Sequence, residues 1–347
     1  MRAFPWLFIC SASLVAQTYT IQKSNTPENL RGLSAPSTKV VWASGTHGTY
    51  LRTTDGGNSW QAAQVPGAEA LDFRDVEAFN ADLAYLLSAG PGGLSRIYKT
   101  ADGGKSWTLQ FVNADPKGFF DCMAFWDRDH GIAVGDPVNG SFELITTDNG
   151  GRRWKPIPAN SLPPAIDGEG AFAASGSCIA VQGRTNVWFA TGGKAARVFR
   201  STDAGKTWSV ADTPILHGAD SSGIFSIAFR DAKHGVIAGG DYKQPEKDGP
   251  HLAFTDDGGL TWHLAAISPQ FYFSGVAWGQ TSSPIQAEPG SAVFAVGSAR
   301  AAYADNLSDK SWKKIWNLNL NSAAYYAPGK VIAVGPNGIV ALLSATP

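Results

Sequence analysis

The sequence has few cysteines, no long hydrophobic run and no excess of charge of either sign. Its 347 residues include three Cys, 28 Lys or Arg and 29 Asp or Glu. No stretch reaches the ~20 apolar residues that a transmembrane helix needs. The balanced charge argues against nucleic acid as a partner, because a nucleic-acid-binding surface is normally rich in basic residues. The sequence also lacks a His-Glu-x-x-His metal motif and a Gly-x-Ser-x-Gly nucleophile elbow, so we expect no metal and no cofactor.

Residues 1–16 have the composition of a secretion signal. Arg2 is the single charge in this segment, Phe4–Ile9 is apolar, and small or apolar residues continue to Ala16. This order is typical of a signal peptide that is cleaved after a small residue. We expect cleavage near Ala16 and export to the periplasm or the medium. A lipoprotein anchored at Cys10 and a cytoplasmic protein with an apolar N-terminus are the alternatives.

A motif of the pattern Ser/Thr-x-Asp-x-Gly-x-Ser/Thr-Trp recurs along the chain. These residue types suit a tight turn between strands: the carboxylate accepts backbone N–H groups, the Gly adopts positive φ, and the Trp buries a large ring. The complete copies are Thr53–Trp60, Thr100–Trp107, Ser201–Trp208 and Thr255–Trp262, and a variant copy is Thr147–Trp154. We assign structural roles to Asp55, Trp60, Asp102, Trp107, Asn149, Trp154, Asp203, Trp208, Asp257 and Trp262.

The spacing of these motifs predicts the architecture. Trp residues at positions 60, 107, 154, 208, 262 and 312 are separated by 47, 47, 54, 54 and 50 residues. A period near 50 indicates a repeat fold, and each unit has the apolar runs of four short strands, as in a propeller blade. We therefore predict an all-β, seven-bladed β-propeller. A kelch propeller has a similar period but is less favoured, because the Gly pairs lie within the Asp motif.

One propeller accounts for residues 17–347 as a single domain. The predicted blades are residues 24–66, 67–113, 114–160, 161–214, 215–268, 269–318 and 319–347. The seventh blade has three strands and no Asp motif, so we predict that residues 17–23 supply its fourth strand and remove an open sheet edge. Cys122 and Cys178 fall in different blades. A disulfide between them is compatible with an oxidising compartment, but we favour two buried free thiols.

The motifs resemble the Asp-box, or BNR-type, repeats of sialidase-like propellers. The fuller unit has an apolar strand, His-Gly, a second apolar strand ending in Gly, and then a box such as Thr53–Trp60. This unit resembles the photosystem II stability/assembly factor family, over nearly all of the chain after residue 25. The resemblance implies an exported, non-catalytic propeller that binds a protein partner or complex. Because enzymes and non-enzymes share the Asp box, a sialidase-like glycoside hydrolase that acts on a glycan at the central channel is the alternative.

Polar residues gather at the predicted starts of the innermost strands and in the loops after the second strands. A propeller's ligand site usually forms where these strands meet the central channel. The predicted channel-mouth residues are Arg31, Asp72, Arg74, Asp75, Asp121, Asp136, Glu169, Asp241, Tyr242 and Tyr272. The competing interpretation is that these residues form structural ion pairs that solvate the channel.

The sialidase resemblance implies catalytic candidates within this set. They are Arg31, Arg74, Asp121, Glu169, Asp241 and Tyr242. Sialidases hold the substrate carboxylate with three Arg residues and use a Tyr nucleophile with a Glu partner and an Asp acid/base. Arg31 and Arg74 supply two such Arg residues, but no third Arg lies at a comparable strand start. The Arg-Ile-Pro motif of sialidases is also absent, because Gly32 follows Arg31. We therefore prefer the protein-binding interpretation.

Overall fold

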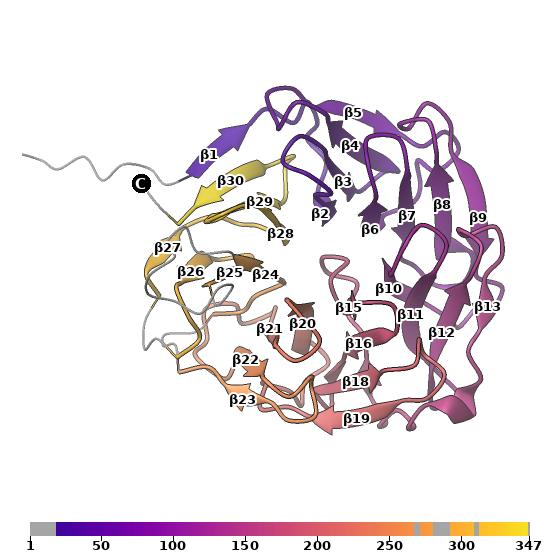
Figure 1. Cartoon of the computed structure of the whole chain (residues 1–347), viewed down its shortest axis with the longest axis vertical. Coiled ribbons are helices and arrows are strands. Elements are labelled where there is room, and N and C mark those ends of the chain that lie inside the picture. The colour runs from indigo at the N-terminus through magenta and orange to yellow at the C-terminus, as the bar shows by residue number, and fades with distance from the viewer. Residues whose placement is uncertain (1–18, 267–270, 280–291, 309–311, 346–347) are drawn as a thin grey trace, which may run out of the picture.

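Seven antiparallel sheets, six of four strands and one of six, surround a central channel in the computed structural model, which is the predicted seven-bladed propeller (Figure 1). The structure describes residues 19–266, 271–279, 292–308 and 312–345. The predicted signal segment, with Cys10 and Ala16, lies outside the described residues. No helix in the described part of the chain has the length and hydrophobicity needed to cross a membrane.

In each of the first six blades the strands follow the chain from the channel outward. Their bounds are β2 (Leu30–Ser34), β3 (Val41–Gly45), β4 (Thr49–Thr53) and β5 (Gln61–Gln64) in blade 1; β6 (Phe73–Ala78), β7 (Ala84–Ser88), β8 (Arg96–Thr100) and β9 (Thr108–Val112) in blade 2; β10 (Phe120–Phe125), β11 (Gly131–Val138), β12 (Ser141–Thr147) and β13 (Lys155–Pro156) in blade 3; β15 (Ile179–Gln182), β16 (Asn186–Ala190), β18 (Arg197–Ser201) and β19 (Ser209–Asp212) in blade 4; β20 (Ser222–Phe229), β21 (Gly235–Asp241), β22 (Leu252–Thr255) and β23 (His263–Leu264) in blade 5; and β24 (Gly275–Gly279), β25 (Ala292–Val296), β26 (Ala301–Ala304) and β27 (Lys314–Trp316) in blade 6.

The seventh blade combines strands from both ends of the chain. Its members are β28 (Ser322–Ala327), β29 (Lys330–Val334), β30 (Val340–Ser344) and, outermost, β1 (Tyr19–Gln22). Strand β1 runs antiparallel to β30, with Tyr19 opposite Leu343 and Gln22 opposite Val340. Figure 1 shows the indigo β1 beside the yellow β30. The predicted closure of the ring by an N-terminal strand is therefore confirmed.

A few short elements lie outside this regular scheme. Strand β14 (Glu169–Gly170) pairs with β17 (Gly192–Gly193), and β17 pairs with β20, so a connection within blade 4 joins the sheet of blade 5. The 3₁₀ turns are η1 (Gly92–Leu94) and η2 (Ala159–Ser161). Glu169, predicted among the polar residues near the start of an innermost strand, lies instead in the short strand β14, before the innermost strand of blade 4. That strand, β15, begins at Ile179, because the preceding residues enter the channel instead.

Each Asp box is a turn whose side chains satisfy its own backbone. In the fourth box, the Ser201 hydroxyl donates to Asp203 Oδ1 (2.8 Å), and the N–H and hydroxyl of Thr207 donate to Asp203 Oδ1 (2.9 Å) and Oδ2 (2.7 Å). The same three bonds form at Asp55, Asp102 and Asp257. In the variant box the Arg153 N–H still donates to Asn149 Oδ1 (2.9 Å), but position 153 offers no hydroxyl.

The Trp residues of the boxes pack between neighbouring blades. Trp107 of blade 2 lies edge-on to Trp42 and Tyr50 of blade 1, with ring centroids 6.2 and 5.0 Å away. Trp262 of blade 5 joins the buried cluster around Trp188 of blade 4 in the same way. Burying such rings is strongly favourable, so the repeated Trp fixes the spacing of the blades as well as each turn.

Candidate functional site

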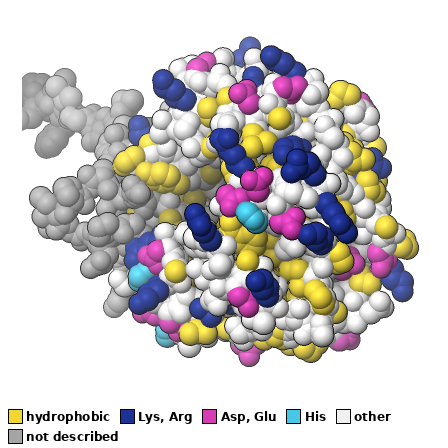
Figure 2. Space-filling model, turned by 45° about the vertical axis from the view of Figure 1, so that its right-hand side comes forward, with side chains coloured by type: hydrophobic (Ala, Val, Ile, Leu, Met, Phe, Trp, Pro, Cys, Tyr) yellow, Lys and Arg dark blue, Asp and Glu magenta, His cyan; other side chains and the backbone are white. Residues whose placement is uncertain are grey.

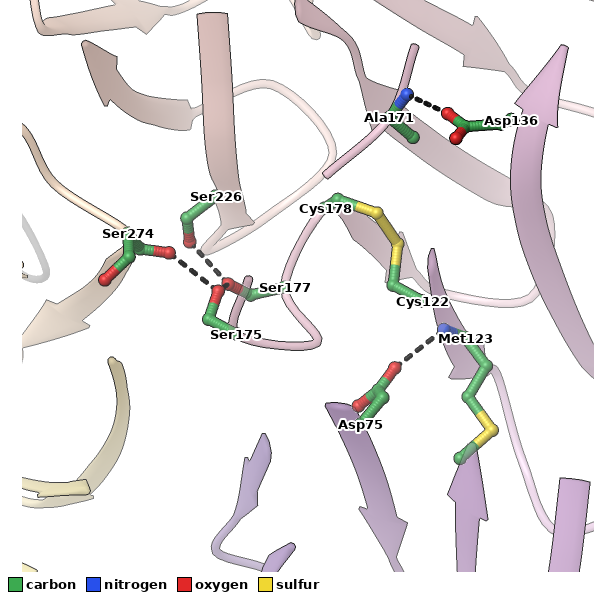
Figure 3. The surroundings of a disulfide bond; sticks show 10 residues. All are labelled: Asp75, Cys122, Met123, Asp136, Ala171, Ser175, Ser177, Cys178, Ser226 and Ser274. Atoms are coloured by element: carbon green, nitrogen blue, oxygen red, sulfur yellow. Dashed lines mark hydrogen bonds between the residues drawn. A yellow bond between two sulfur atoms is a disulfide. The ribbon is translucent and has the colours of Figure 1, made fainter. Parts of the chain in front are cut away.

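The segment Ala171–Ser177 crosses the central channel and bonds to blades on its far side (Figure 3). We call it the channel plug. The Ser175 hydroxyl donates to the carbonyl oxygen of Ser274 in blade 6 (2.6 Å), and the hydroxyls of Ser177 and Ser226 of blade 5 share a hydrogen bond (2.7 Å). The Ser322 hydroxyl of blade 7 donates to the carbonyl oxygen of Ser175 (3.2 Å). Short polar side chains thus satisfy the plug's backbone inside the ring.

A disulfide between Cys122 and Cys178 anchors the end of the plug to blade 3. Both residues are fully buried, and their Cα atoms are 6.0 Å apart. Our expectation of two buried free thiols was therefore wrong. The physical reason is the path of the plug. Because the plug ends at the start of β15, Cys178 lies directly beside Cys122 on the neighbouring innermost strand β10.

A pocket of about 450 Å³ opens at the channel mouth beside the plug. Four of the predicted site residues line it: Arg31, Arg74, Tyr242 and Tyr272. The rest of its wall is formed by Ser274 and by six residues that sequence reasoning missed, which are Phe172, Ala173 and Ala174 of the plug, together with Phe225, Ser298 and Asn321. Phe172 was missed because its segment was read as a strand. Asn321 comes directly before β28, the innermost strand of blade 7, and predicted site residues lie near the start of the innermost strand in other blades. This shared position in the repeat could have identified Asn321 from the sequence.

The electrostatic character of this channel-mouth pocket comes from its two arginines. Arg74 Nε donates to Asp72 (2.5 Å) and its Nη1 donates to the carbonyl oxygen of Ala173 (2.8 Å). Arg31 Nε is buried and has no hydrogen-bond partner among the described residues. Burial, followed by the neighbouring Arg74, lowers the pKa of Arg31. A guanidinium still stays charged in a protein, so the pocket offers an unpaired positive charge to an anion.

This preference for an anion is local to the pocket. Figure 2 shows Lys and Arg side chains interspersed with Asp and Glu over the face turned to the viewer, with hydrophobic side chains between them. A mixed surface of this kind gives little long-range attraction for a ligand of one sign. Recognition must therefore depend on the short-range geometry of the pocket.

Three predicted carboxylates lie beside the plug, and none of them lines the pocket: Asp75 and Asp121 are buried, and Asp136 is half-buried. Asp75 accepts from the Met123 N–H (2.7 Å), and Asp136 accepts from the Ala171 N–H (2.9 Å). Asp121 is 1% exposed, and its Oδ2 has no partner among the described residues. Burial raises the pKa of all three groups, that of Asp136 to about 6. Asp136 therefore supports the plug at Ala171, and Asp75 links blade 2 to Met123 of blade 3.

The remaining predicted residues lie elsewhere. Glu169 is in a buried ion pair with Arg197, whose Nε and Nη2 donate to the two carboxylate oxygens. The Thr191 hydroxyl also donates to Glu169 Oε1 (2.6 Å). Asp241 accepts from the N–H of Lys243 (2.9 Å) and so closes a turn. Neither carboxylate lines the channel-mouth pocket.

The Asp136→Asn variant is expected to flatten the pH dependence of stability between pH 4 and 6. The pKa of Asp136 is about 6 in the fold against an ordinary value of 3.8, so the folded protein binds more protons in this range. The free energy of unfolding of the wild type therefore falls as pH rises from 4 to 6, by at most about 3 kcal/mol from this group. Asn keeps the acceptor for the Ala171 N–H but does not titrate.

Urea unfolding at pH 4.5 and pH 7 measures this difference. Asp75 and Glu77, whose pKa values burial raises, add declines of the same sign in both proteins. The charge of Asp136 also raises the pKa of Asp121, so that shift is smaller in the variant and flattens its pH dependence further. Asp248→Asn, which changes an exposed carboxylate, is the control and should keep the slope of the wild type. Equal slopes for the wild type and Asp136→Asn would show that Asp136 does not bind the extra proton.

Comparison with known proteins gives one sequence relative and several structural neighbours. The family model described as BNR/Asp-box repeat matches residues 199–210. The photosystem II assembly protein Ycf48 of Synechococcus sp. (strain JA-2-3B'a(2-13)) is 26% identical over 275 residues, covering 67% of this chain and 74% of the relative. The resemblance expected from the sequence is therefore confirmed.

The structural neighbours agree on the fold. A structure titled "YCF48 bound to D1 peptide" matches with a TM-score of 0.65 at 14% identity, covering 94% of this chain and 97% of that one. A structure titled "Structure of U3-55K" matches with a TM-score of 0.64 at 11% identity, covering 95% of this chain and 99% of that one. The chain is thus an Asp-box propeller that is similar to photosystem II assembly proteins.

Proposed function

We propose that this protein is an exported, non-catalytic assembly or stability factor that holds a peptide segment of a protein partner in the channel-mouth pocket. The observation that carries the proposal is Arg31, a half-buried guanidinium with an unpaired Nε beside Arg74. A carboxylate is the group that best satisfies such a site, because guanidinium groups bind carboxylates through paired, charge-assisted hydrogen bonds. The anion would come from an acidic side chain or from the C-terminus of the partner.

The rest of the pocket suits a peptide. Phe172, Phe225 and Tyr242 offer apolar surface for the side chains of a peptide. Similarity to Ycf48, together with a structural neighbour titled with a D1 peptide, supports a peptide as the ligand class. A photosystem II protein as the partner is part of this proposal. Export is supported by the Cys122–Cys178 disulfide, because disulfides persist in oxidising compartments.

The pocket supports binding better than glycoside hydrolysis. Among the described residues its lining contains two arginines, whereas the sialidase pattern needs three. Glu169, a predicted catalytic candidate, is held by Arg197 away from the pocket. Tyr242, the tyrosine among the catalytic candidates, has no Asp or Glu beside it in the described lining of the pocket that could act as its partner. We therefore place the pocket residues in binding roles.

The Arg31→Ala variant is expected to weaken peptide binding at least tenfold. Removing the guanidinium leaves the carboxylate of the ligand with one charged partner, and a charge-assisted hydrogen bond contributes about 1.5–3 kcal/mol. The probe is an Ala-Leu-Ala-Leu-Ala peptide with a free C-terminal carboxylate, labelled at its N-terminus with an uncharged fluorophore and followed by fluorescence anisotropy. The same peptide with an amidated C-terminus should bind at least tenfold more weakly than the acid.

Arg153→Ala is the matched control, because it removes an exposed guanidinium from an Asp-box turn. It should bind the peptide as the wild type does. If Arg31→Ala and the wild type bind both peptides equally, the pocket is not the site. Turnover of chromogenic glycosides or sialosides that is lost in Arg31→Ala would instead establish the hydrolase.

A further inference from the structure

A second pocket, of about 490 Å³, lies between blades 2 and 3, away from the channel. We call it the inter-blade pocket. Strand β9 and the loop after it form one wall, and β12 with the chain after β13 forms the other. The lining residues used below are Phe111, Val112, Asn113, Asp115, Ser141, Phe142, Glu143 and Trp154. None of them belongs to an element that forms the channel plug.

Several polar atoms in this pocket are buried without a hydrogen bond. They are Asn113 Nδ2, Ser141 Oγ, Glu143 Oε2 and Trp154 Nε1, none of which has a partner among the described residues. Asn113 is 6% exposed, and its Oδ1 accepts from the Asp115 N–H (3.1 Å), which leaves Nδ2 as the free end of the amide. Unmet buried donors and acceptors are rare in folded proteins and costly. The presence of four such atoms in one pocket indicates that a bound ligand supplies their hydrogen-bond partners.

The charge of the pocket indicates whether that ligand is a cation or an anion. Asp115 and Glu143 are its charged lining residues, and both are acidic. Burial, followed by repulsion from Asp115, raises the pKa of Glu143, and no cation of the described chain offsets that shift. The rings of Phe111, Phe142 and Trp154 supply walls against which an aliphatic stem can pack and a cation can rest. The chemistry therefore fits an organic cation on an aliphatic stem.

We propose that the inter-blade pocket binds a Lys or Arg side chain carried on a segment of a protein partner. The backbone C=O and N–H groups of a protein segment can form the hydrogen bonds that Asn113 Nδ2 and Ser141 Oγ lack. Val112, at the edge of the pocket, is 42% exposed and offers apolar surface to the residues that flank the cation. Strand β13 pairs with β12 only at Ile145 and Thr146 among the described residues, so no strand covers the outer side of Ser141–Glu143. This proposal does not depend on the channel-mouth pocket.

Fluorescence anisotropy with an Ala-Leu-Lys-Leu-Ala amide, labelled at its N-terminus with an uncharged fluorophore, tests the proposal. This probe has no carboxylate, so the channel-mouth pocket has no anion to bind. We expect saturable binding, and at least tenfold weaker binding of the same peptide with norleucine in place of Lys. Glu143→Gln should weaken binding of the Lys peptide at least tenfold, because it removes the charge and keeps the shape. Glu143→Lys, which places a cation in the pocket, should abolish binding.

Two control variants show where the peptide binds. Glu246→Gln changes a carboxylate that is 68% exposed in another blade, and Arg31→Ala changes the channel-mouth pocket. Both should bind the Lys peptide as the wild type does, and all variants should melt within a few degrees of it. The proposal is overturned if the norleucine peptide binds equally well, if Glu143→Gln has no effect, or if no saturation occurs at millimolar peptide. Equally tight binding of free n-butylammonium would overturn the assignment to a protein partner.

Discussion

The Arg197→Met variant is expected to lose about 3–5 kcal/mol of unfolding free energy. Its partner Glu169 has a side chain with 0% exposure, and Arg197 has 9%. Removing one member of a buried ion pair leaves the other charge without compensation in a poorly solvated site. Arg197 Nη2 also donates to the carbonyl oxygen of Pro164 (3.0 Å), and this bond is lost too. Urea unfolding followed by Trp fluorescence at pH 7 measures the change.

Two further variants distinguish the stability lost with the ion pair from the stability lost with packing. Glu169→Gln combined with Arg197→Met removes both charges, and we expect it to recover more than half of the loss, since an uncharged pair needs no compensation. Lys155→Met breaks the exposed pair with Asp148 (2.7 Å), whose side chains are 47% and 55% exposed. That variant should cost less than about 1 kcal/mol. A loss in Arg197→Met as small as that of Lys155→Met would contradict the structural role of the buried pair.

Replacing Cys122 and Cys178 together by Ala is expected to lower the free energy of unfolding by about 4 kcal/mol. The disulfide closes a loop with a sequence separation of 56 residues. In the chain-entropy model a loop of this length contributes about 4 kcal/mol, mainly by restricting the unfolded chain. Equilibrium urea unfolding of the oxidised wild type and the double variant gives the difference directly.

The same double variant should also affect the channel-mouth pocket. Phe172, Ala173 and Ala174 form part of its wall, and the disulfide anchors the end of their segment. We expect weaker binding of the free-acid peptide described above, with no further effect of a dithiol reductant. In the wild type, reduction under denaturing conditions followed by refolding should reproduce the stability of the double variant. Unchanged stability in both samples would show that the bond has no such role.

The Asp boxes, the number of blades and the closing strand were predictable because their signals are local or periodic. Asp203, Gly205 and Trp208 have turn chemistry that can be read within eight residues, and the repeated Trp counts the blades. The closing strand followed from a blade that lacked one strand. Such features depend on short-range physics, so tertiary context has little opportunity to override them.

The channel plug was not predictable, because it has no regular pattern. Residues 171–177 have neither strand alternation nor an Asp box, and the bonds that hold them come from four other blades. For the same reason the pairing of Glu169 with Arg197, 28 residues away, and the disulfide were hidden. Arg31 and Arg74 were predicted correctly as pocket residues because the innermost strands of any propeller begin at the channel. The position of these two residues therefore follows from the repeat pattern alone.

The channel plug also changes how the blades depend on one another. In an ideal repeat protein each unit contacts its two neighbours, and stability is a sum of unit and nearest-neighbour contributions. Here a segment of blade 4 bonds to Arg74 of blade 2, Ser274 of blade 6 and Ser322 of blade 7. Loss of any of these blades removes partners from the same central segment. The plug therefore acts as a hub that couples distant blades and favours unfolding as one cooperative unit, even though the sequence is built from nearly independent repeats.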